Sequence, residues 1–205
     1  MSKTIINIGR EFGSGGKSVA LELGKLLDIP VYDQELIAKA AEESGLSASL
    51  FSRNDEKHSL FDTASFFPVS RFGSISHDSA ISDENIFRIQ SETIRGIAER
   101  SDAIFIGRAS DYVLRDRHCL DVFICAPLKA RIERISERLC LEPERARKLI
   151  EKTDRSRREY YDFFTQGHWG VASNYDLCID SSVLGIEQTA LAIVDFARRA
   201  GVLQK

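Results

Sequence analysis

The sequence predicts an α/β fold with three layers, in which a five-stranded, mostly parallel sheet is covered by helices on both faces. Short apolar runs alternate with amphipathic helical segments along most of the 205 residues, an alternation typical of parallel strands joined by crossover helices. The first apolar run also leads directly into a glycine-rich stretch, "GREFGSGGKS" (9–18), that opens a helix. A chain of this length suits one domain, so we expect residues 1–205 to form a single unit.

The positions of the individual elements follow from the same periodicity. Strands are expected at the apolar runs 4–9, 29–33, 103–107, 120–126 and 175–181. Helices are expected at 17–27, 34–44, 84–101, 128–139 and 185–200. Ser82 or Asp83 is a suitable cap for the third helix, and Pro127 suits the first position of the fourth.

One segment breaks this alternation. The stretch between about residues 50 and 82 is rich in Ser and Asp but carries five phenylalanines: Phe51, Phe61, Phe66, Phe67 and Phe72. A plain linker would not hold so many aromatic rings, so we interpret the region of about 45–85 as an insert that buries them against the rest of the molecule. The alternative is a disordered loop in which the aromatic residues are incidental.

Composition and charge narrow the class of protein. The net charge of −3 gives no reason to expect a nucleic-acid polymer as partner. Residues 129–158 nevertheless hold eleven Lys or Arg against six Asp or Glu, and a basic segment in an acidic chain suggests a small anionic ligand. No apolar run approaches the roughly 18 residues of a membrane helix, and we expect a cytoplasmic protein whose four cysteines are reduced and mostly buried. An oligomer is compatible with the sequence, which carries no pattern that specifies one.

The glycine-rich stretch has the composition of a phosphate-binding loop. Residues 11–18, "EFGSGGKS", fit the pattern G-x-x-x-x-G-K-[ST] except that Glu11 stands at the first glycine. Backbone amides of such a loop surround a phosphate, the lysine reaches the outer phosphates, and the hydroxyl that follows binds Mg²⁺. We therefore expect this loop to bind ATP with Mg²⁺ at Ser18; its binding residues are Gly13, Ser14, Gly15, Gly16, Lys17 and Ser18. A tight strand-to-helix turn without a ligand is the alternative.

Four stretches together resemble the cytidylate kinase-like family, the relatives of bacterial CMP kinase among the P-loop nucleoside monophosphate kinases. They are "GREFGSGGKSVA", "IFIGRASDYVL", "KTDRSRREYYDFFTQGHWG" and "NYDLCIDSSVLGIEQTALAIVDF". The resemblance covers most of the chain and is weakest at about 45–85. It implies a P-loop kinase fold in which about 129–165 form a basic helical lid and about 45–85 an insert on the acceptor side.

The resemblance also implies roles for individual residues. Lys17, Arg131, Arg157 and Arg158 would contact the phosphates during transfer, with Arg134 as an alternative to Arg131. Arg108 would bind the phosphate of the acceptor, and Arg10 either does the same or is held by Glu11. Asp33 and Lys39 correspond to the Asp and Arg of an acceptor-binding run whose Ser, Gly and Tyr are absent here. Tyr160, Tyr161 and Trp169 would either stack on a base or fix the end of their helix by apolar burial.

Three functions remain open at this stage. The first is ATP-dependent phosphoryl transfer to a nucleoside monophosphate such as CMP or dCMP. The second is transfer to another small acceptor, suggested by the altered 33–39 stretch and by the unusual segment at 50–82. The third is a nucleotide-binding regulatory protein without turnover, suggested by Ile106, which stands where CMP kinases carry Asp before Gly-Arg.

Overall fold

The computed structural model describes residues 3–44 and 77–203. The five phenylalanines of the predicted insert all lie outside these ranges, so the interpretation of that segment stays a prediction. Within the described ranges, no helix has both the length and the apolar character that a membrane crossing requires.

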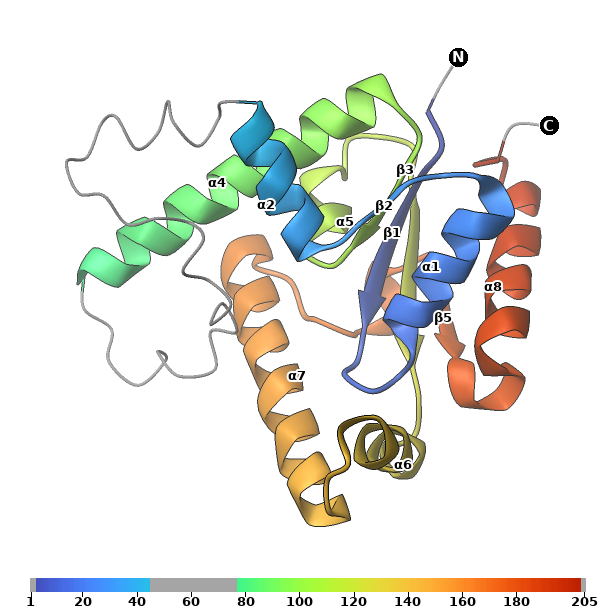
Figure 1. The fold of residues 1–205 in the computed structure, drawn as a ribbon. Helices are drawn as coiled ribbons and strands as arrows, with labels where there is room; N and C mark the ends of the chain where they lie inside the picture. The colour runs from blue at the N-terminus through green and yellow to red at the C-terminus, as the bar shows by residue number, and fades with distance from the viewer. Residues whose placement is uncertain (1–2, 45–76, 204–205) are drawn as a thin grey trace.

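Five strands form one parallel sheet, which confirms the predicted fold class (Figure 1). Their order is β2-β3-β1-β4-β5, so that β1 lies in the centre between β3 and β4. Because all the strands run the same way, their carboxyl ends meet at one edge, where open α/β sheets bind ligands. The strands are β1 (Ile5–Arg10), β2 (Val31–Tyr32), β3 (Ala103–Ile106), β4 (Leu120–Cys125) and β5 (Leu177–Asp180).

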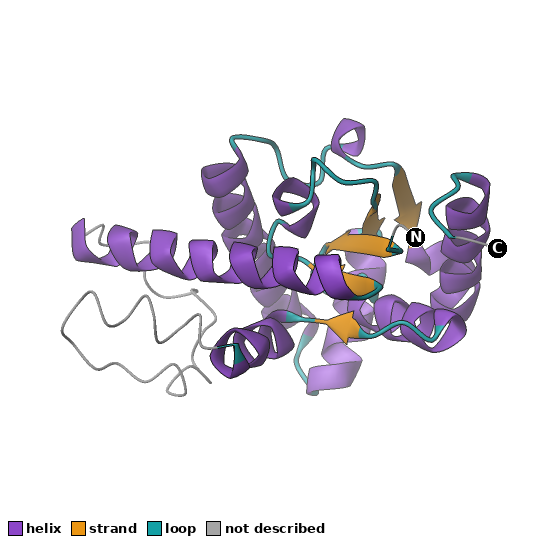
Figure 2. Ribbon diagram, turned by 90° about the horizontal axis from the view of Figure 1, so that it is seen from above, coloured by secondary structure: helices purple, strands orange, loops and turns teal. Residues whose placement is uncertain are grey.

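Helices cover both faces of the sheet (Figure 2). One face packs against α1 (Gly16–Leu27) and α8 (Ser181–Arg199), which contact each other. The other face is covered by α2 (Gln34–Glu43), α4 (His77–Arg100) and α5 (Ser110–Val113). A hairpin of α6 (Leu128–Leu139) and α7 (Pro143–Thr165) extends beyond the carboxyl edge of the sheet (Figure 1).

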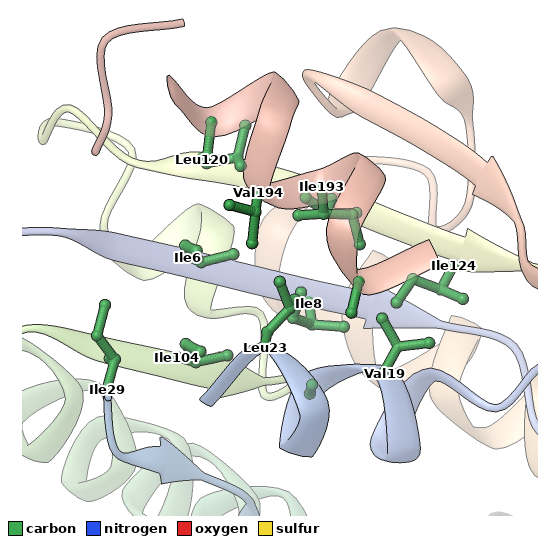
Figure 3. Packing of buried hydrophobic residues seen from close by; sticks show 14 of the residues in the cluster. Ile6, Ile8, Val19, Leu23, Ile29, Ile104, Leu120, Ile124, Ile193 and Val194 are labelled. Atoms are coloured by element: carbon green, nitrogen blue, oxygen red, sulfur yellow. The ribbon is translucent and has the colours of Figure 1, made fainter. Parts of the chain in front are cut away.

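The larger core lies between the sheet and the α1–α8 layer (Figure 3). Its side chains are almost all aliphatic and are removed from solvent, which stabilises the fold by roughly 1.5–3 kcal/mol for each large side chain. A second cluster fixes the other layer and includes Ile37, Ile94, Phe105 and Val113. The first cluster includes Ile6, Ile8, Val19, Leu23, Ile104, Ile124, Ile193 and Val194.

Three local predictions need correction. Helix α4 begins at His77 rather than near Asp83, because no Gly or Pro in residues 77–83 interrupts it and a serine is tolerated inside a helix. Pro127 precedes α6 instead of opening it, since its ψ of 142° is extended. All four cysteines are free, but Cys119 and Cys125 are only half-buried and Cys140 and Cys178 are exposed.

Candidate active site

A cavity of about 540 Å³ lies at the carboxyl edge of the sheet. Its walls come from the ends of β1, β2 and β3, the start of α1 and the hairpin helices α6 and α7. This size is within the range of small-molecule sites, and the position is where a doubly wound sheet places its ligand.

The loop between β1 and α1, residues 10–18, forms the floor of this cavity and is called the glycine loop below. Five consecutive carbonyl oxygens of this loop accept hydrogen bonds from side-chain donors, four of which come from outside the loop. Arg157 Nη1 donates to the Arg10 carbonyl (3.0 Å), Ser14 Oγ to Glu11 (2.9 Å), Arg131 Nη1 to Phe12 (3.4 Å), Arg134 Nη1 to Gly13 (2.9 Å) and Ser181 Oγ to Ser14.

These contacts determine where the backbone amides of the loop point. Across a planar peptide the C=O of one residue and the N–H of the next lie in opposite directions. When donors hold the carbonyls of Phe12 and Ser14 away from the cavity, the amides of Gly13 and Gly15 turn toward it. The first amides of α1 end at the same place and have no acceptor within the helix. The result is a cup of N–H groups of the kind that binds an anion.

The glycines allow α6 to pack directly on the loop. Gly13 has a φ of 82°, and a Cβ there would lie 3.2 Å from both the Cβ and the carbonyl oxygen of Arg131. Any side chain at this position would therefore be strained and would push the helix away from the loop. A glycine at position 13 is thus required by packing as well as by backbone conformation.

Lys17 and Ser18 lie at the start of α1, where both line the cavity and are exposed. Lys17 Nζ forms an ion pair with Asp33 Oδ2 at 2.8 Å. Asp33 follows β2 and caps α2 by accepting a hydrogen bond from the Leu36 N–H at 3.2 Å. Burial opposes ionisation of this carboxyl, but the hydrogen bonds from Lys17 and Leu36 hold the pKa of Asp33 below its ordinary value.

Arg10, Arg108 and Arg157, called the arginine triad below, face the cavity from three different elements. Among the described residues, none of the three forms an ion pair with a carboxylate within 4.0 Å. Burial, together with the charges of Arg157 and Arg108, lowers the pKa of Arg10 well below its ordinary value. Burial also lowers the pKa of Arg157 to about 10, although the charge of Asp154 opposes this. Three cations that repel one another in a cavity form a site for a strongly anionic group.

The backbone after β3 directs Arg108 into the cavity. Gly107, Arg108 and Ala109 all have left-handed conformations, with φ values of 69°, 63° and 51°. Such conformations are costly for residues with a Cβ and cluster at functional sites. The Arg108 guanidinium donates to the side-chain oxygen of Gln34 and lies 5.0 Å from the centre of the Tyr160 ring.

Four of the predicted site residues do not line the cavity. Ser14 is fully buried, and its hydroxyl donates to the Glu11 carbonyl within the loop. Lys39 points along α2 toward Glu43, 3.9 Å away, and Arg158 lies over the ring of Trp169 at 5.8 Å. Arg131, predicted to contact the transferring group, is only 9% exposed and is held between two carboxylates: Asp154 at 2.5 Å and Glu11 at 3.5 Å.

Of the two alternatives on α6, Arg134 lines the cavity and Arg131 does not. Other residues reach the cavity without having been predicted as site residues. Arg138 lines it two turns beyond Arg131 on α6, and its guanidinium lies 5.6 Å from the centre of the Phe12 ring. Asp111 and Tyr175 also line it. The spacing of arginines on α6 carried a signal for Arg134 and Arg138, but nothing near Tyr175 in the sequence marks it.

One wall of the cavity is aromatic. Tyr160, Tyr161, Trp169 and Tyr175 line it. Tyr161 Oη donates to Asp111 Oδ2 at 2.7 Å, and the Trp169 ring packs against Phe123 at 5.4 Å. Burial raises the pKa of Asp111, while the hydrogen bond from Tyr161 opposes the increase. These rings therefore fix α7 and its following loop by burial, and they also form a wall of the site.

The parallel sheet, the glycine loop that opens α1 and the arginines around it define the P-loop class of small-molecule kinases, which are phosphotransferases. The sequence profile of the Cytidylate kinase-like family matches residues 5–183. The chain therefore belongs to the Cytidylate kinase-like family, as the resemblance of its motifs predicted.

Individual relatives are consistent with this assignment. A cytidylate kinase from Methanopyrus kandleri is 26% identical over 195 residues, which cover 90% of this chain and 88% of the relative. An uncharacterized protein from Eubacterium ventriosum has a similar crystal structure, with a TM-score of 0.72, 24% identity and coverage of 95% of this chain and 98% of that one. A shikimate kinase from Bacteroides thetaiotaomicron shares the fold with a TM-score of 0.53 and 12% identity, at 95% and 98% coverage.

Proposed function

We propose that this protein transfers the γ-phosphoryl group of ATP to a nucleoside monophosphate of the CMP or dCMP kind. The observation that carries the proposal is the arginine triad, which lines the cavity with no carboxylate within 4.0 Å in the part of the chain that the structure describes. Phosphoryl transfer spreads negative charge over the transferred group, and positioned cations stabilise that charge. The name of the relative from Methanopyrus kandleri supports the choice of acceptor.

The donor end of the cavity suits the phosphates of ATP. The amides of Gly13, Gly15 and the first turn of α1 would receive them, and Lys17 would leave Asp33 to contact the outer phosphates. The exposed Ser18 hydroxyl at the start of α1 is the group that would hold Mg²⁺. The ion would neutralise charge on the bridging and outer phosphate oxygens.

In the transfer step, an oxygen of the acceptor phosphate forms a bond to the γ-phosphorus while the bond from that phosphorus to the β–γ bridging oxygen breaks. The products are ADP and a nucleoside diphosphate. Because the attacking phosphate oxygen is already ionised, this reaction needs no general base. Arg108 and Arg10 would bind the acceptor phosphate. Arg157 would stabilise the charge of the γ-phosphoryl group during its transfer. Asp33, whose pKa is held low, would position the acceptor rather than take a proton.

One observation favours a second candidate, a hydroxyl-bearing acceptor. Asp111 lines the same cavity, and burial raises the pKa of its carboxyl, which makes it a better base than an ordinary aspartate. A hydroxyl acceptor must lose its proton during transfer, so it would need such a base. The two candidates therefore differ in whether Asp111 takes part in the chemistry.

A panel of acceptors incubated with ATP labelled in the γ-phosphate tests the proposal. We expect label in the diphosphate products of CMP or dCMP, and a kcat that changes by less than about threefold in Asp111→Asn. If CMP, dCMP and UMP stay unlabelled while a hydroxyl compound is labelled and Asp111→Asn abolishes that transfer, the second candidate replaces the first. ATP binding without label in any acceptor would instead indicate a regulatory protein.

A further inference from the structure

A chain of three charged side chains lies under the glycine loop. Arg131 Nη1 is 2.5 Å from Asp154 Oδ2, and Arg131 Nη2 is 3.5 Å from Glu11 Oε1. The side chains of Arg131 and Asp154 are 11% and 13% exposed, and that of Glu11 is 24% exposed. Glu11–Arg131–Asp154 is called the ion-pair chain below.

Each end of the ion-pair chain also holds the backbone. Glu11 Oε2 accepts a hydrogen bond from the Ala126 N–H (3.0 Å), at the end of β4. Asp154 Oδ1 accepts one from the Phe12 N–H (2.7 Å), and Arg131 Nη1 donates to the Phe12 carbonyl (3.4 Å). Both polar groups of Phe12 are therefore fixed by residues of the α6–α7 hairpin.

Glu11 occupies the position of the first glycine in the phosphate-loop pattern, and its contacts explain why a glycine is not needed there. The Glu11 N–H donates to the Ile124 carbonyl at 3.1 Å, which extends the pairing of β1 with β4 by one residue. The left-handed turns come later, at Gly13 and Gly15. The side chain at position 11 is then free to join the loop to Arg131.

We propose that Glu11, Arg131 and Asp154 are positioning residues of the donor site, which set the direction of the loop amides without touching the transferring group. With both of its polar groups held, Phe12 cannot rotate its peptides, and the Gly13 N–H stays directed into the cavity. Arg131 accordingly acts through the loop and not on phosphate. This inference rests on the proposed use of ATP, because the donor phosphates are what the loop would bind.

A substitution that breaks the ion-pair chain would let the loop amides turn away from the phosphates. It should therefore weaken the binding of ATP more than the binding of the acceptor. Glu11 and Asp154 both pair with Arg131, so their contributions are not independent. Removing both charges should therefore weaken ATP binding by a smaller factor than the product of the two single factors. A purely structural chain would lower the melting temperature without separating the two substrates.

The test uses Asp154→Asn and Glu11→Gln, which keep shape and remove charge, together with the double variant. Glu151→Gln is the matched control, since Glu151 lies one turn earlier on α7 in an exposed pair with Arg147. Calorimetry measures the Kd of a non-hydrolysable ATP analogue with Mg²⁺, steady-state kinetics give the KM of CMP, and Tm is recorded for each protein.

We expect the analogue to bind about tenfold more weakly to Asp154→Asn, with the KM of CMP changed less than twofold. In the double variant, the Kd of the analogue should increase by a smaller factor than the product of the increases in the two single variants.

The contrary results are distinct. A wild-type Kd for the analogue combined with a large loss of kcat in these variants would overturn the inference, because it would mean that the chain serves the transfer step itself. A lower Tm with unchanged Kd and KM would also overturn it, leaving a role in folding alone. Failure of the wild-type protein to bind the analogue at all would overturn the proposed function instead.

Discussion

The charged side chains under the glycine loop differ from those that line the cavity in whether they have a partner of opposite charge. At the donor end, Asp154 and Glu11 are paired with Arg131, and the glycine loop carbonyls from residue 10 to 14 all accept a side-chain hydrogen bond. Above the loop, the arginine triad and Asp111 line the cavity and have no partner of opposite charge within 4.0 Å among the described residues.

This difference suggests two roles: the paired charges hold the loop in place, and the charges that line the cavity bind substrate. A buried charge without a counter-ion is unfavourable in the folded protein, so it persists where a ligand completes it. The paired charges under the glycine loop hold its backbone in one conformation. The arginine triad has no carboxylate partner among residues 3–44 and 77–203, which supports the proposal that it binds the phosphates of the substrates.

The largest effect is expected at Arg157, the most buried cation of the α7 side of the cavity. Arg157→Ala removes a charge that would stabilise the transferring group, and we expect kcat to fall by about 10³-fold. Initial rates with saturating substrates measure it. Arg155→Ala, exposed on the same helix, is the control and should keep kcat within twofold. A loss below tenfold for Arg157→Ala would mean that the triad does not serve transfer.

Asp33 tests the acceptor end on its own. Asp33→Asn keeps the cap on α2 but removes the charge, so the KM of the acceptor should rise about tenfold while the KM of ATP changes less than threefold. The control is Glu43→Gln, which lies in an exposed pair on the same helix. A larger change in the KM of ATP than of the acceptor would place Asp33 at the donor end instead.

A third prediction concerns the stability of the sheet, through Asp121 near the start of β4. Burial and the charges of Asp111 and Asp176 raise the pKa of Asp121 to about 6, although a hydrogen bond from Asn7 opposes this. The folded state then binds a proton more tightly than the unfolded state, where the pKa is about 4, so stability falls as pH rises from about 4 to 6.

Asp121→Asn should therefore raise the unfolding free energy at pH 7.5 by about 1–2 kcal/mol and flatten its dependence on pH. Urea denaturation at pH 4.5, 6 and 7.5 measures both, with the exposed Asp116→Asn as control. Equal pH slopes for Asp121→Asn and the wild type would show that Asp121 is not a strained carboxylate.

The smallest effects sharpen the outline of the site. Lys39 and Arg158 were expected at the site from the resemblance, but neither lines the cavity. Lys39→Ala and Arg158→Ala should each leave kcat and both KM values within about twofold, since exposed pairs contribute little. A tenfold loss in either variant would mean that the hairpin or α2 moves toward the substrates in the complex.

The local pattern of the sequence predicted the fold. The alternation of apolar runs and helical segments predicted all five strands, and "GSGGKS" predicted the glycine-rich loop that opens α1, because both depend on neighbours in sequence. That this loop binds an anion stays a prediction. The resemblance added the family, but it could not decide which arginines face the cavity.

The choice between Arg131 and Arg134 depends on packing that the sequence only hints at. Arg131 lies one turn before the buried Ile135, a spacing that places it on the buried face of α6. Arg131 and its partner Asp154 are separated by 23 positions in the sequence. Asp154 in turn accepts a hydrogen bond from the N–H of Phe12, which is 142 positions from it. Contacts at such separation arise from the fold and leave no local pattern.

The central claim is that the glycine loop is a donor-phosphate cup completed by Lys17. Calorimetric titration with a non-hydrolysable ATP analogue and Mg²⁺ tests it most directly, using the wild type, Lys17→Ala and the control Lys25→Ala, which removes an exposed lysine from the same helix. We expect the wild type and Lys25→Ala to bind with equal Kd, and Lys17→Ala to bind at least about tenfold more weakly. Equal binding by all three proteins, or none by the wild type, would contradict it.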